Sequence, residues 1–303
     1  KQKGEENWAT PKILGKKKRR DREKSEKPKK RSEELPAVKI GLCQLRVEPE
    51  REKNLEKTAQ LLKAAAGGGA EMAVLPEMFN CPYQHDLFPV FAEEEGGETT
   101  SLLSRIAREE GLWVVGGSIP ERDGEKIYNT CFIYDPDGNR VARHRKLHLF
   151  DIDLPGKVTV AESATLTPGE EFTLFNAGAC RVGVGICYDL RFPEYARILS
   201  LRGADLLVIP AAFSQVTGPA HWEILLRTRA VDNQFYTAGV SSVPNPSLSY
   251  LAYGHSMLVD PWGEIKGALG EEEGVLVGTV DLSRLQEIRS VLPLLTHRRT
   301  DLY

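Results

Sequence analysis

Residues 181–202 read RVGVGICYDLRFPEYARILSLR and contain a strand, a turn and a helix in succession. Val182, Val184 and Ile186 are apolar at every second position, which is typical of a buried strand. Pro193 suits the first turn of a helix, so we expect a helix at 193–202. Cys187 therefore lies at a strand-to-helix turn.

The same kinds of pattern continue along the chain on both sides of this unit. We expect further strands at 38–45, 72–75, 112–119, 127–134, 140–146, 205–209 and 235–241, and further helices at 52–66, 100–110 and 219–233. The turn sequences DPDGN at 135–139 and PWG at 261–263 predict hairpins. This mixture indicates an α/β fold in which helices cover the sheets. No linker interrupts residues 36–303, so we expect one domain there.

Residues 1–35 differ from the rest of the chain in charge and hydropathy. They carry 14 Lys/Arg and 7 Asp/Glu, a net charge of +7, and few apolar side chains. We interpret them as a basic disordered tail, because so polar a segment cannot offset the entropy of ordering. The run KKKRR at 16–20 is either a polyanion-binding or nuclear-import patch, or part of a solvated linker or a remnant of a targeting extension. Since the whole chain carries −3, residues 36–303 carry about −10, which disfavours nucleic-acid binding there.

The five cysteines predict neither a metal site nor a disulfide framework, because they are scattered and form no C-x-x-C pair. His144 and His148 are four residues apart in or just after the predicted strand at 140–146, and on a strand this spacing does not align two metal ligands. We expect no metal and a reducing, cytoplasmic location; a mitochondrial or other organellar location is the alternative if the tail derives from a targeting extension. No apolar run approaches the ~18–20 residues of a membrane span, so we expect no membrane partner.

Cys187 is a candidate nucleophile. We expect a thiol at a strand-to-helix turn to be exposed, and the nearby helix N-terminus to lower its pKa from ~8.5 toward neutrality. The alternative is a buried core cysteine, which is the usual state of a free Cys.

Glu77 and Lys146 are candidate partners of this thiol. Glu77 follows the apolar residues 73–76, and open α/β folds keep their ligands at strand ends. The alternative is a surface glutamate that enters a loop. Lys146 lies in RHRKLH at 143–148, and such a basic run is usually a solvated face. It follows a predicted hairpin strand and precedes Leu147, so it is also a candidate to point inward at the same sheet edge.

Three motifs, in this order and at this spacing, resemble the nitrilase superfamily of carbon–nitrogen hydrolases. They are LPE at 75–77, HRKLHLF at 144–150 and GVGICYD at 183–189. Other stretches are similar to the omega-amidase branch of that superfamily: DIDLPGK at 151–157, ES at 162–163, TGPAHWE at 217–223, RAVDNQ at 229–234 and DLY at 301–303. The resemblance covers residues 38–303, and the basic tail departs from it.

The resemblance implies a four-layer α-β-β-α sandwich that pairs as a homodimer through one helical face. It implies that Cys187 attacks, that Glu77 carries protons, and that Lys146 stabilises the oxyanion together with the backbone N–H of Tyr188. Glu162 matches a second glutamate that supports this triad, or it merely helps to hold Lys146. No cofactor is required for amide hydrolysis of this kind.

Arg191 is the candidate residue for substrate specificity. It follows Cys187 by four residues, and a guanidinium can hold a carboxylate through two parallel hydrogen bonds. The alternative is a structural salt bridge with Asp189 or Glu194.

The resemblance also assigns Phe213, Thr217 and Tyr83 to the substrate pocket. The implied substrates are small amides, namely the omega-amides of short 2-oxo dicarboxylates, 2-oxoglutaramate and 2-oxosuccinamate. Two other functions stay open. One is a different carbon–nitrogen hydrolase activity on the same scaffold, either N-carbamoyl amidohydrolase or nitrilase. The other is a non-catalytic adaptor that binds polyanions through the basic tail.

Overall fold

The computed structural model describes residues 35–303, and contacts between them group Leu35–Tyr303 into one unit. The basic tail predicted for residues 1–35 falls outside the described residues, apart from Leu35 itself. Among the described residues, no helix is both long and apolar enough to cross a membrane.

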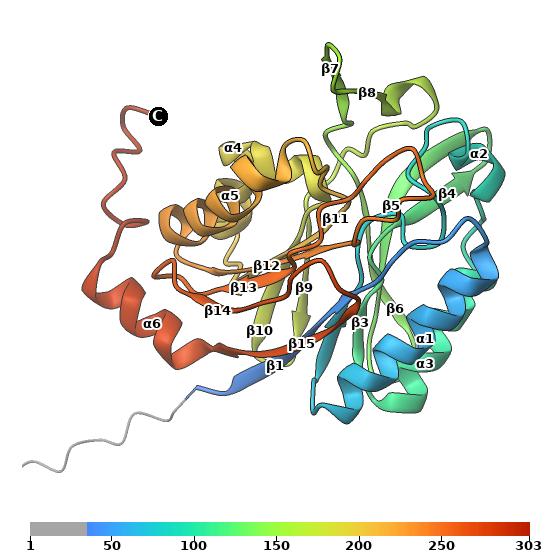
Figure 1. Ribbon diagram of the computed structural model, residues 1–303. Coiled ribbons are helices and arrows are strands. Elements are labelled where there is room, and N and C mark those ends of the chain that lie inside the picture. The colour runs from blue at the N-terminus through green and yellow to red at the C-terminus, as the bar shows by residue number, and fades with distance from the viewer. Residues whose placement is uncertain (1–34) are drawn as a thin grey trace, which may run out of the picture. The chain divides into compact units, whose positions relative to one another are not determined.

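The first sheet has seven strands (Figure 1). Its order is β15 (Gly274–Asp281), β1 (Ala37–Gln44), β2 (Met72–Val74), β3 (Trp113–Val115), β5 (Lys126–Tyr134) and β4 (Ile119–Asp123), and β6 (Arg140–Arg145) also pairs with β5. Strands β1, β2 and β3 are parallel to one another, and the other pairs are antiparallel. The first strand of the described chain therefore lies beside its last strand.

The second sheet has six strands with a parallel centre. Its order is β14 (Ile265–Ala268), β13 (Met257–Val259), β12 (Tyr236–Ser241), β11 (Leu206–Ala211), β10 (Cys180–Val184) and β9 (Thr173–Ala177). Strands β10, β11 and β12 are parallel. A separate pair, β7 (Asp151–Leu154) and β8 (Val158–Ala161), projects at one end of the molecule (Figure 1).

Helices cover the outer face of each sheet (Figure 1). Helices α1 (Arg51–Gly67) and α3 (Glu98–Glu110) pack on the first sheet through Leu62 and Leu103. Helices α4 (Pro193–Leu201) and α5 (Gly218–Asn233) pack on the second sheet. Two further helices are the short α2 (Phe88–Phe91) and α6 (Leu282–Val291), which follows β15.

The main hydrophobic core lies between the two sheets. Leu42 and Val74 of the first sheet belong to the same buried cluster as Val184 and Val208 of the second. Apolar faces of two sheets bury each other in this way, and the helices bury the outer faces. The four-layer α-β-β-α sandwich predicted for this chain is confirmed.

The predicted strand at 112–119 is wrong in one respect, because the structure divides it into β3 and β4. Gly117, between them, has φ of +55°, and a Cβ atom there would lie 2.2 Å from the carbonyl oxygen of Pro76. Only glycine fits such a close approach, and from this point the chain passes from β3 to β4 on the other side of β5 in the same sheet. Six further elements were not predicted from the sequence: β7, β8, β9, β15, α2 and α6.

Candidate active site

Glu77 enters the site from the loop that follows β2. Its backbone N–H donates to the carbonyl of Ala211 (3.3 Å), and its Oε2 accepts the N–H of Ala212 (2.9 Å), so residues at the end of β11 in the other sheet hold it. The next residue, Met78, has φ of +48°, a conformation that costs roughly 1–2 kcal/mol outside glycine. Glu77 is 1% exposed, so the alternative of a surface glutamate is wrong.

Lys146 directly follows β6, along which side chains alternate between solvent and interior. Arg143 is exposed and His144 is buried, and Lys146 continues the inward-facing set with 1% exposure. Its Nζ lies 2.8 Å from Glu77 Oε1 and 2.9 Å from Glu162 Oε2. The solvated-face alternative therefore holds for Arg143 and is wrong for Lys146.

Glu162 follows β8 and begins a short 3-10 turn, Glu162–Ala164. Its Oε1 accepts the hydroxyl of Tyr83 (2.7 Å), and its Oε2 accepts the N–H of Phe150 (2.7 Å). The amide of Asn129 donates to Glu77 Oε1 (2.8 Å) and more distantly to Glu162 Oε1 (3.4 Å). Every carboxylate oxygen of Glu77 and Glu162 therefore has at least one donor, as buried carboxylates require.

The two carboxylates and the ammonium control one another's protonation. Burial alone would lower the pKa of Lys146, but Glu162 and Glu77 outweigh it and raise that pKa above its ordinary value. Burial raises the pKa of Glu77, and Lys146 opposes this only in part. Lys146 therefore stays charged, whereas Glu77 binds a proton more readily than an ordinary glutamate.

Cys187 follows β10 after Gly185 and Ile186, and it begins a second 3-10 turn, Cys187–Arg191. Its φ is +43°, a left-handed conformation that is uncommon outside glycine. Its side chain is 5% exposed, so the expectation of an exposed thiol is wrong. Cys187 is buried, as the alternative interpretation of a buried cysteine predicted. The thiol nevertheless lies within the electrostatic reach of Glu77 and Lys146.

The expected lowering of the Cys187 pKa is also wrong for this resting site. Burial raises the pKa of the thiol, and the Glu77 carboxylate raises it further. Lys146 and the N–H of Ala212 act in the opposite direction but do not outweigh these two effects. Cys187 therefore holds its proton beside a glutamate whose own pKa is raised.

Arg191 lies at the end of the Cys187 turn and has neutral partners. Its Nη2 donates to Thr217 Oγ1 (3.2 Å), and its Nη1 lies 3.0 Å from His221 Nδ1. Its guanidinium carbon lies 4.7 Å from the ring centre of Phe213 and 5.9 Å from that of Tyr188. Three residues predicted for substrate binding thus surround Arg191.

The alternative role of Arg191 in a salt bridge does not fit the structure. Asp189 is buried and accepts hydrogen bonds from Ile186 and His148 instead. Glu194 is exposed, and no carboxylate within residues 35–303 lies within salt-bridge distance of Arg191. In the described part of the chain, this guanidinium has no anionic partner.

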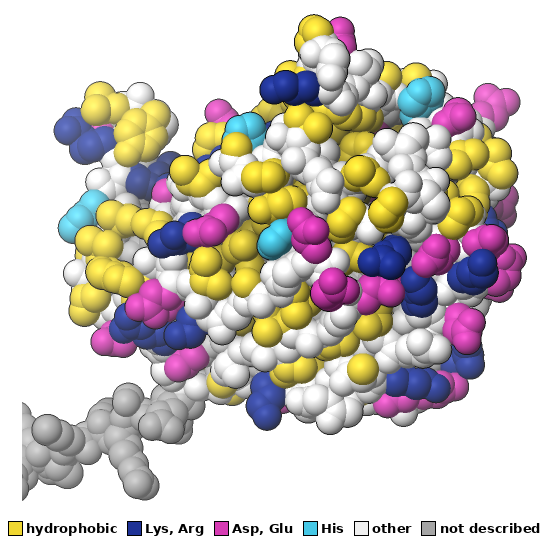
Figure 2. Space-filling view, viewed as in Figure 1, with side chains coloured by type: hydrophobic (Ala, Val, Ile, Leu, Met, Phe, Trp, Pro, Cys, Tyr) yellow, Lys and Arg dark blue, Asp and Glu magenta, His cyan; other side chains and the backbone are white. Residues whose placement is uncertain are grey.

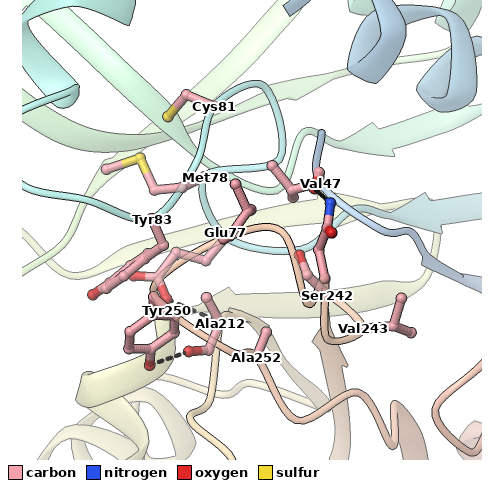
Figure 3. Close-up of a pocket in the computed structure, with 12 residues that line it drawn as sticks. Val47, Glu77, Met78, Cys81, Tyr83, Ala212, Ser242, Val243, Tyr250 and Ala252 are labelled. Atoms are coloured by element: carbon pink, nitrogen blue, oxygen red, sulfur yellow. Dashed lines mark hydrogen bonds between the residues drawn. The ribbon is translucent and has the colours of Figure 1, made fainter. Parts of the chain in front are cut away.

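Two tyrosines close the site beside Glu77 (Figure 3). The ring centres of Tyr83 and Tyr250 are 4.6 Å apart, and the hydroxyl of Tyr250 donates to the carbonyl of Ala212 (2.6 Å). They line a cavity of about 20 Å³ together with Glu77, Met78 and eight other residues, and Cys187 is not among these. That volume suits one water molecule. Tyr83, predicted for substrate binding, contacts Glu162 directly.

Three contributors to the site were missed by sequence analysis. Asn129 carries the one amide side chain in the mainly apolar stretch 127–134. An amide among apolar residues of a predicted strand could have indicated a buried side chain with a hydrogen-bonding role. The N–H of Ala212 is a backbone group and has no sequence signal. Tyr250 lies in an irregular segment whose position follows from tertiary contacts alone.

Comparisons with known proteins identify the family of this chain. The carbon-nitrogen hydrolase family matches residues 39–290. Omega-amidase NIT2-A of Xenopus laevis is 51% identical over 269 residues, which are 89% of this chain and 98% of that protein. Omega-amidase NIT2 of Bos taurus is 49% identical with the same coverage. Among solved structures, Nit3 of Saccharomyces cerevisiae, a member of branch 10 of the nitrilase superfamily, has a TM-score of 0.80 and 38% identity, with 88% of this chain and 98% of that chain covered.

Proposed function

Because the chain belongs to the carbon-nitrogen hydrolase family, we propose that it hydrolyses small amides as an omega-amidase. The prediction of the nitrilase superfamily, and of an enzyme that cleaves carbon–nitrogen bonds, is confirmed by the family match. The proposed substrates are 2-oxoglutaramate and 2-oxosuccinamate, whose terminal amides are converted to carboxylates with release of ammonia.

The observation that carries this substrate class is the position of Arg191. A cation without an anionic partner in the described chain lies at the end of the turn that begins with Cys187. Its contacts with Thr217 and Phe213 orient the guanidinium, and a substrate carboxylate supplies the missing negative charge. An omega-amide of a dicarboxylate carries such a carboxylate at the end remote from its amide.

In the first half of the proposed reaction, the sulfur of Cys187 attacks the amide carbon. Glu77 takes the thiol proton as the C–S bond forms, which its raised pKa favours. Lys146 and the backbone N–H of Tyr188 stabilise the negative oxygen of the tetrahedral intermediate. Glu77 then returns the proton to the amide nitrogen, the C–N bond breaks, and ammonia leaves a thioester on Cys187.

In the second half, water hydrolyses the thioester. Glu77 takes a proton from the water as its oxygen bonds to the carbonyl carbon, and Lys146 again stabilises the oxyanion. The C–S bond breaks, the proton returns to Cys187, and the dicarboxylate leaves. Glu162, Tyr83 and Asn129 hold Lys146 and Glu77 in place throughout, because their hydrogen bonds fix both carboxylates. No residue of this scheme needs a cofactor.

We further propose that the protein is a homodimer through the outer face of α5. Ile224 and Val231 on this helix are 61% and 41% exposed, and Trp262 beside them is 52% exposed. Hydrophobic side chains reach the surface in the region of α5, whereas charged side chains of both signs cover the region of α1 and α3 (Figure 2). Exposed apolar residues of this size, in one patch, are typical of subunit interfaces.

We also propose a cytoplasmic location for the protein and a division of the chain into a tail and a hydrolase domain. Five free, buried cysteines suit a reducing cytoplasmic compartment. Residues 36–303 are proposed to form the hydrolase domain, and the tail at 1–35 to take no part in catalysis. Deletion of residues 1–35 should therefore leave amide hydrolysis unchanged.

The decisive experiment is a substrate panel with ammonia detection on the purified chain. We expect ammonia release from 2-oxoglutaramate at a kcat/KM well above that for a neutral amide of similar length. N-carbamoyl amino acids, which yield carbon dioxide as well as ammonia, and aliphatic nitriles are the competing substrates. Higher kcat/KM for either of these would contradict the omega-amidase proposal but not the family assignment.

A further inference from the structure

Asp189 makes two hydrogen bonds within the turn that contains Cys187. Its backbone N–H donates to the carbonyl of Ile186 (3.0 Å), and its Oδ2 accepts the N–H of Ile186 (2.9 Å). These reciprocal bonds span Cys187, whose φ of +43° is an unfavourable conformation that the surroundings have to impose. Asp189 is therefore one of the groups that hold the nucleophile in this conformation.

The other oxygen of Asp189 reaches a different part of the chain. Its Oδ1 accepts the backbone N–H of His148 (3.0 Å) and lies 2.7 Å from His148 Nδ1. His148 follows Lys146 by two residues, and its ring stacks on Phe192 with ring centres 3.7 Å apart. One carboxylate therefore bonds the backbone beside the nucleophile and the backbone beside the lysine.

This link joins segments that come from different sheets. Lys146 follows β6 of the first sheet, and Cys187 follows β10 of the second. No named strand of one sheet pairs with a strand of the other, although backbone hydrogen bonds join the sheets elsewhere, from Glu77 to Ala211 and from Val243 to Leu45. A shared carboxylate supplies a directional contact that the packing of apolar side chains does not.

A buried network holds the carboxylate itself. His144 Nε2 lies 3.5 Å from Asp189 Oδ2, and its Nδ1 lies 3.1 Å from the hydroxyl of Thr173 on β9. The hydroxyl of Tyr195 lies 3.3 Å from the same His144 Nε2. Burial alone would raise the pKa of Asp189, but the bonds from His144 and His148 outweigh it and lower the pKa to about 2.

We propose that Asp189 is a positioning residue that sets the distance between Lys146 and Cys187 by bonding the backbones of both segments. The inference rests on the proposed function, since it assigns Asp189 a role in that reaction. Asp189 touches neither Arg191 nor its partners Thr217 and Phe213 in the contacts described. Its loss should therefore change turnover more than substrate affinity.

Asp189→Asn is the variant that tests this role. It preserves the shape of the side chain but places an amide NH₂ where a backbone N–H needs an acceptor. We expect kcat on 2-oxoglutaramate to fall about 10- to 100-fold, because displacement of a reacting group by ~1 Å costs that much, and KM to change by less than about threefold. An unchanged kcat, or a loss confined to KM, would overturn the proposal.

Asp205→Asn is the matched control. Asp205 lies just before β11, at the opposite end of the parallel strands from Cys187, and accepts bonds from the backbone of Arg181 and from Arg289. This variant should lower thermal stability by a similar amount and leave kcat unchanged. If the two variants lose kcat in the same proportion to their stability, Asp189 is only structural.

Hydrogen exchange followed by mass spectrometry tests the link without any substrate. In Asp189→Asn, amides in peptides that cover 144–150 and 183–191 should both exchange faster, and in Asp205→Asn neither should. Faster exchange in 183–191 alone would make Asp189 a local cap and overturn the proposal. Because this result does not depend on amide hydrolysis, it separates failure of the positioning role from failure of the omega-amidase assignment.

His148→Phe keeps the proposal testable if Asp189→Asn fails to fold. Phenylalanine preserves the stack on Phe192 and removes only the bond from Nδ1 to Asp189. We expect a smaller fall in kcat, about 3- to 10-fold, with KM again little changed. In a double variant the two losses should not add, because both remove the same link. An unchanged kcat in His148→Phe, or additive losses, would contradict the role.

Discussion

Lys146 and Arg191 are two cations near the same turn, and the structure surrounds them with different partners. Lys146 is buried between the carboxylates of Glu77 and Glu162, at 2.8 and 2.9 Å. Arg191 is half-buried and contacts a hydroxyl, an imidazole and the face of an aromatic ring. The first charge is neutralised by the protein itself, whereas the second is oriented but left without an anion in the described chain. We infer that the first serves the chemistry and the second selects the substrate.

The largest effect should come from the group next to the neutralised cation. Cys187→Ser should reduce kcat by about 10⁴-fold or more while the fold survives, because a serine hydroxyl has no readily formed anion in this site. Intact-mass spectrometry of the parent enzyme with substrate should show an acyl adduct on Cys187. An adduct on Cys43, Cys81, Cys131 or Cys180 would contradict the assignment.

The comparison makes a direct prediction about stability. Lys146→Met leaves two buried carboxylates without their cation and should lower the free energy of unfolding by about 3–5 kcal/mol. Arg191→Met removes no salt bridge of the described chain and should cost about 1 kcal/mol or less. Urea unfolding at pH 7 measures both, and equal losses would remove the distinction between the two cations.

The pH dependence of the Lys146→Met variant sharpens this result. Even with Lys146 present, burial raises the pKa of Glu77 above its ordinary value of 4.5, and without the cation that pKa rises further. A carboxyl whose pKa is higher in the folded state favours folding at low pH, and this contribution is lost as pH rises above about 4.5. The stability lost in Lys146→Met should therefore be smaller at pH 5 than at pH 8. A loss that is independent of pH would show that the carboxylates are not coupled in this way.

Substrate selection by Arg191 should appear as a contrast between substrates. Arg191→Lys keeps the charge but loses the two-point geometry, so kcat/KM for 2-oxoglutaramate should fall by about 1–3 kcal/mol in transition-state free energy. A neutral amide should be much less affected, because it has no carboxylate to bind. Equal losses on both substrates would make Arg191 a structural residue.

The smallest effect concerns the resting thiol. Glu77→Gln removes the negative charge that raises the pKa of Cys187, so the thiolate fraction at neutral pH should increase about tenfold for each unit by which that pKa falls. Iodoacetamide should then alkylate Cys187 faster in this variant than in the parent enzyme, although hydrolysis is lost. Slower alkylation would mean that Glu77 activates the thiol in the absence of substrate.

The parts of this molecule that local sequence patterns determine were predictable. The hairpin at 135–139, and with it the strand that precedes Lys146, follows from its turn residues, and the strands that precede Glu77 and Cys187 follow from their apolar patterns. The fold and family followed from three motifs in register. Strand β15 was missed because its side chains are half-buried on both faces and show no alternation.

The electrostatic state of the site could not be read from the sequence. A turn at a helix start suggested an exposed thiol with a lowered pKa, but burial and the charge of Glu77 raise that pKa instead. Both causes depend on the packing of one sheet against the other, since Glu77 and Cys187 come from different sheets. The backbone of Ala212 and the ring of Tyr250 likewise acquire their roles only in the assembled sandwich.

The pairing of β1 with β15 has a consequence for how the protein is made. Ala37 pairs with Asp281 and Gln44 with Gly274, and the Gln44 side chain donates to the carbonyl of Gly270, 226 positions away. A ribosome releases the β1 end of this pairing long before the β15 end, and loop closure over such a separation is slow. One edge of β1 therefore stays unpaired until nearly all of the described chain has been synthesised. During that interval the nascent chain is open to wrong strand pairing, so chaperone occupancy on the ribosome should fall only after residue 281 leaves the exit tunnel.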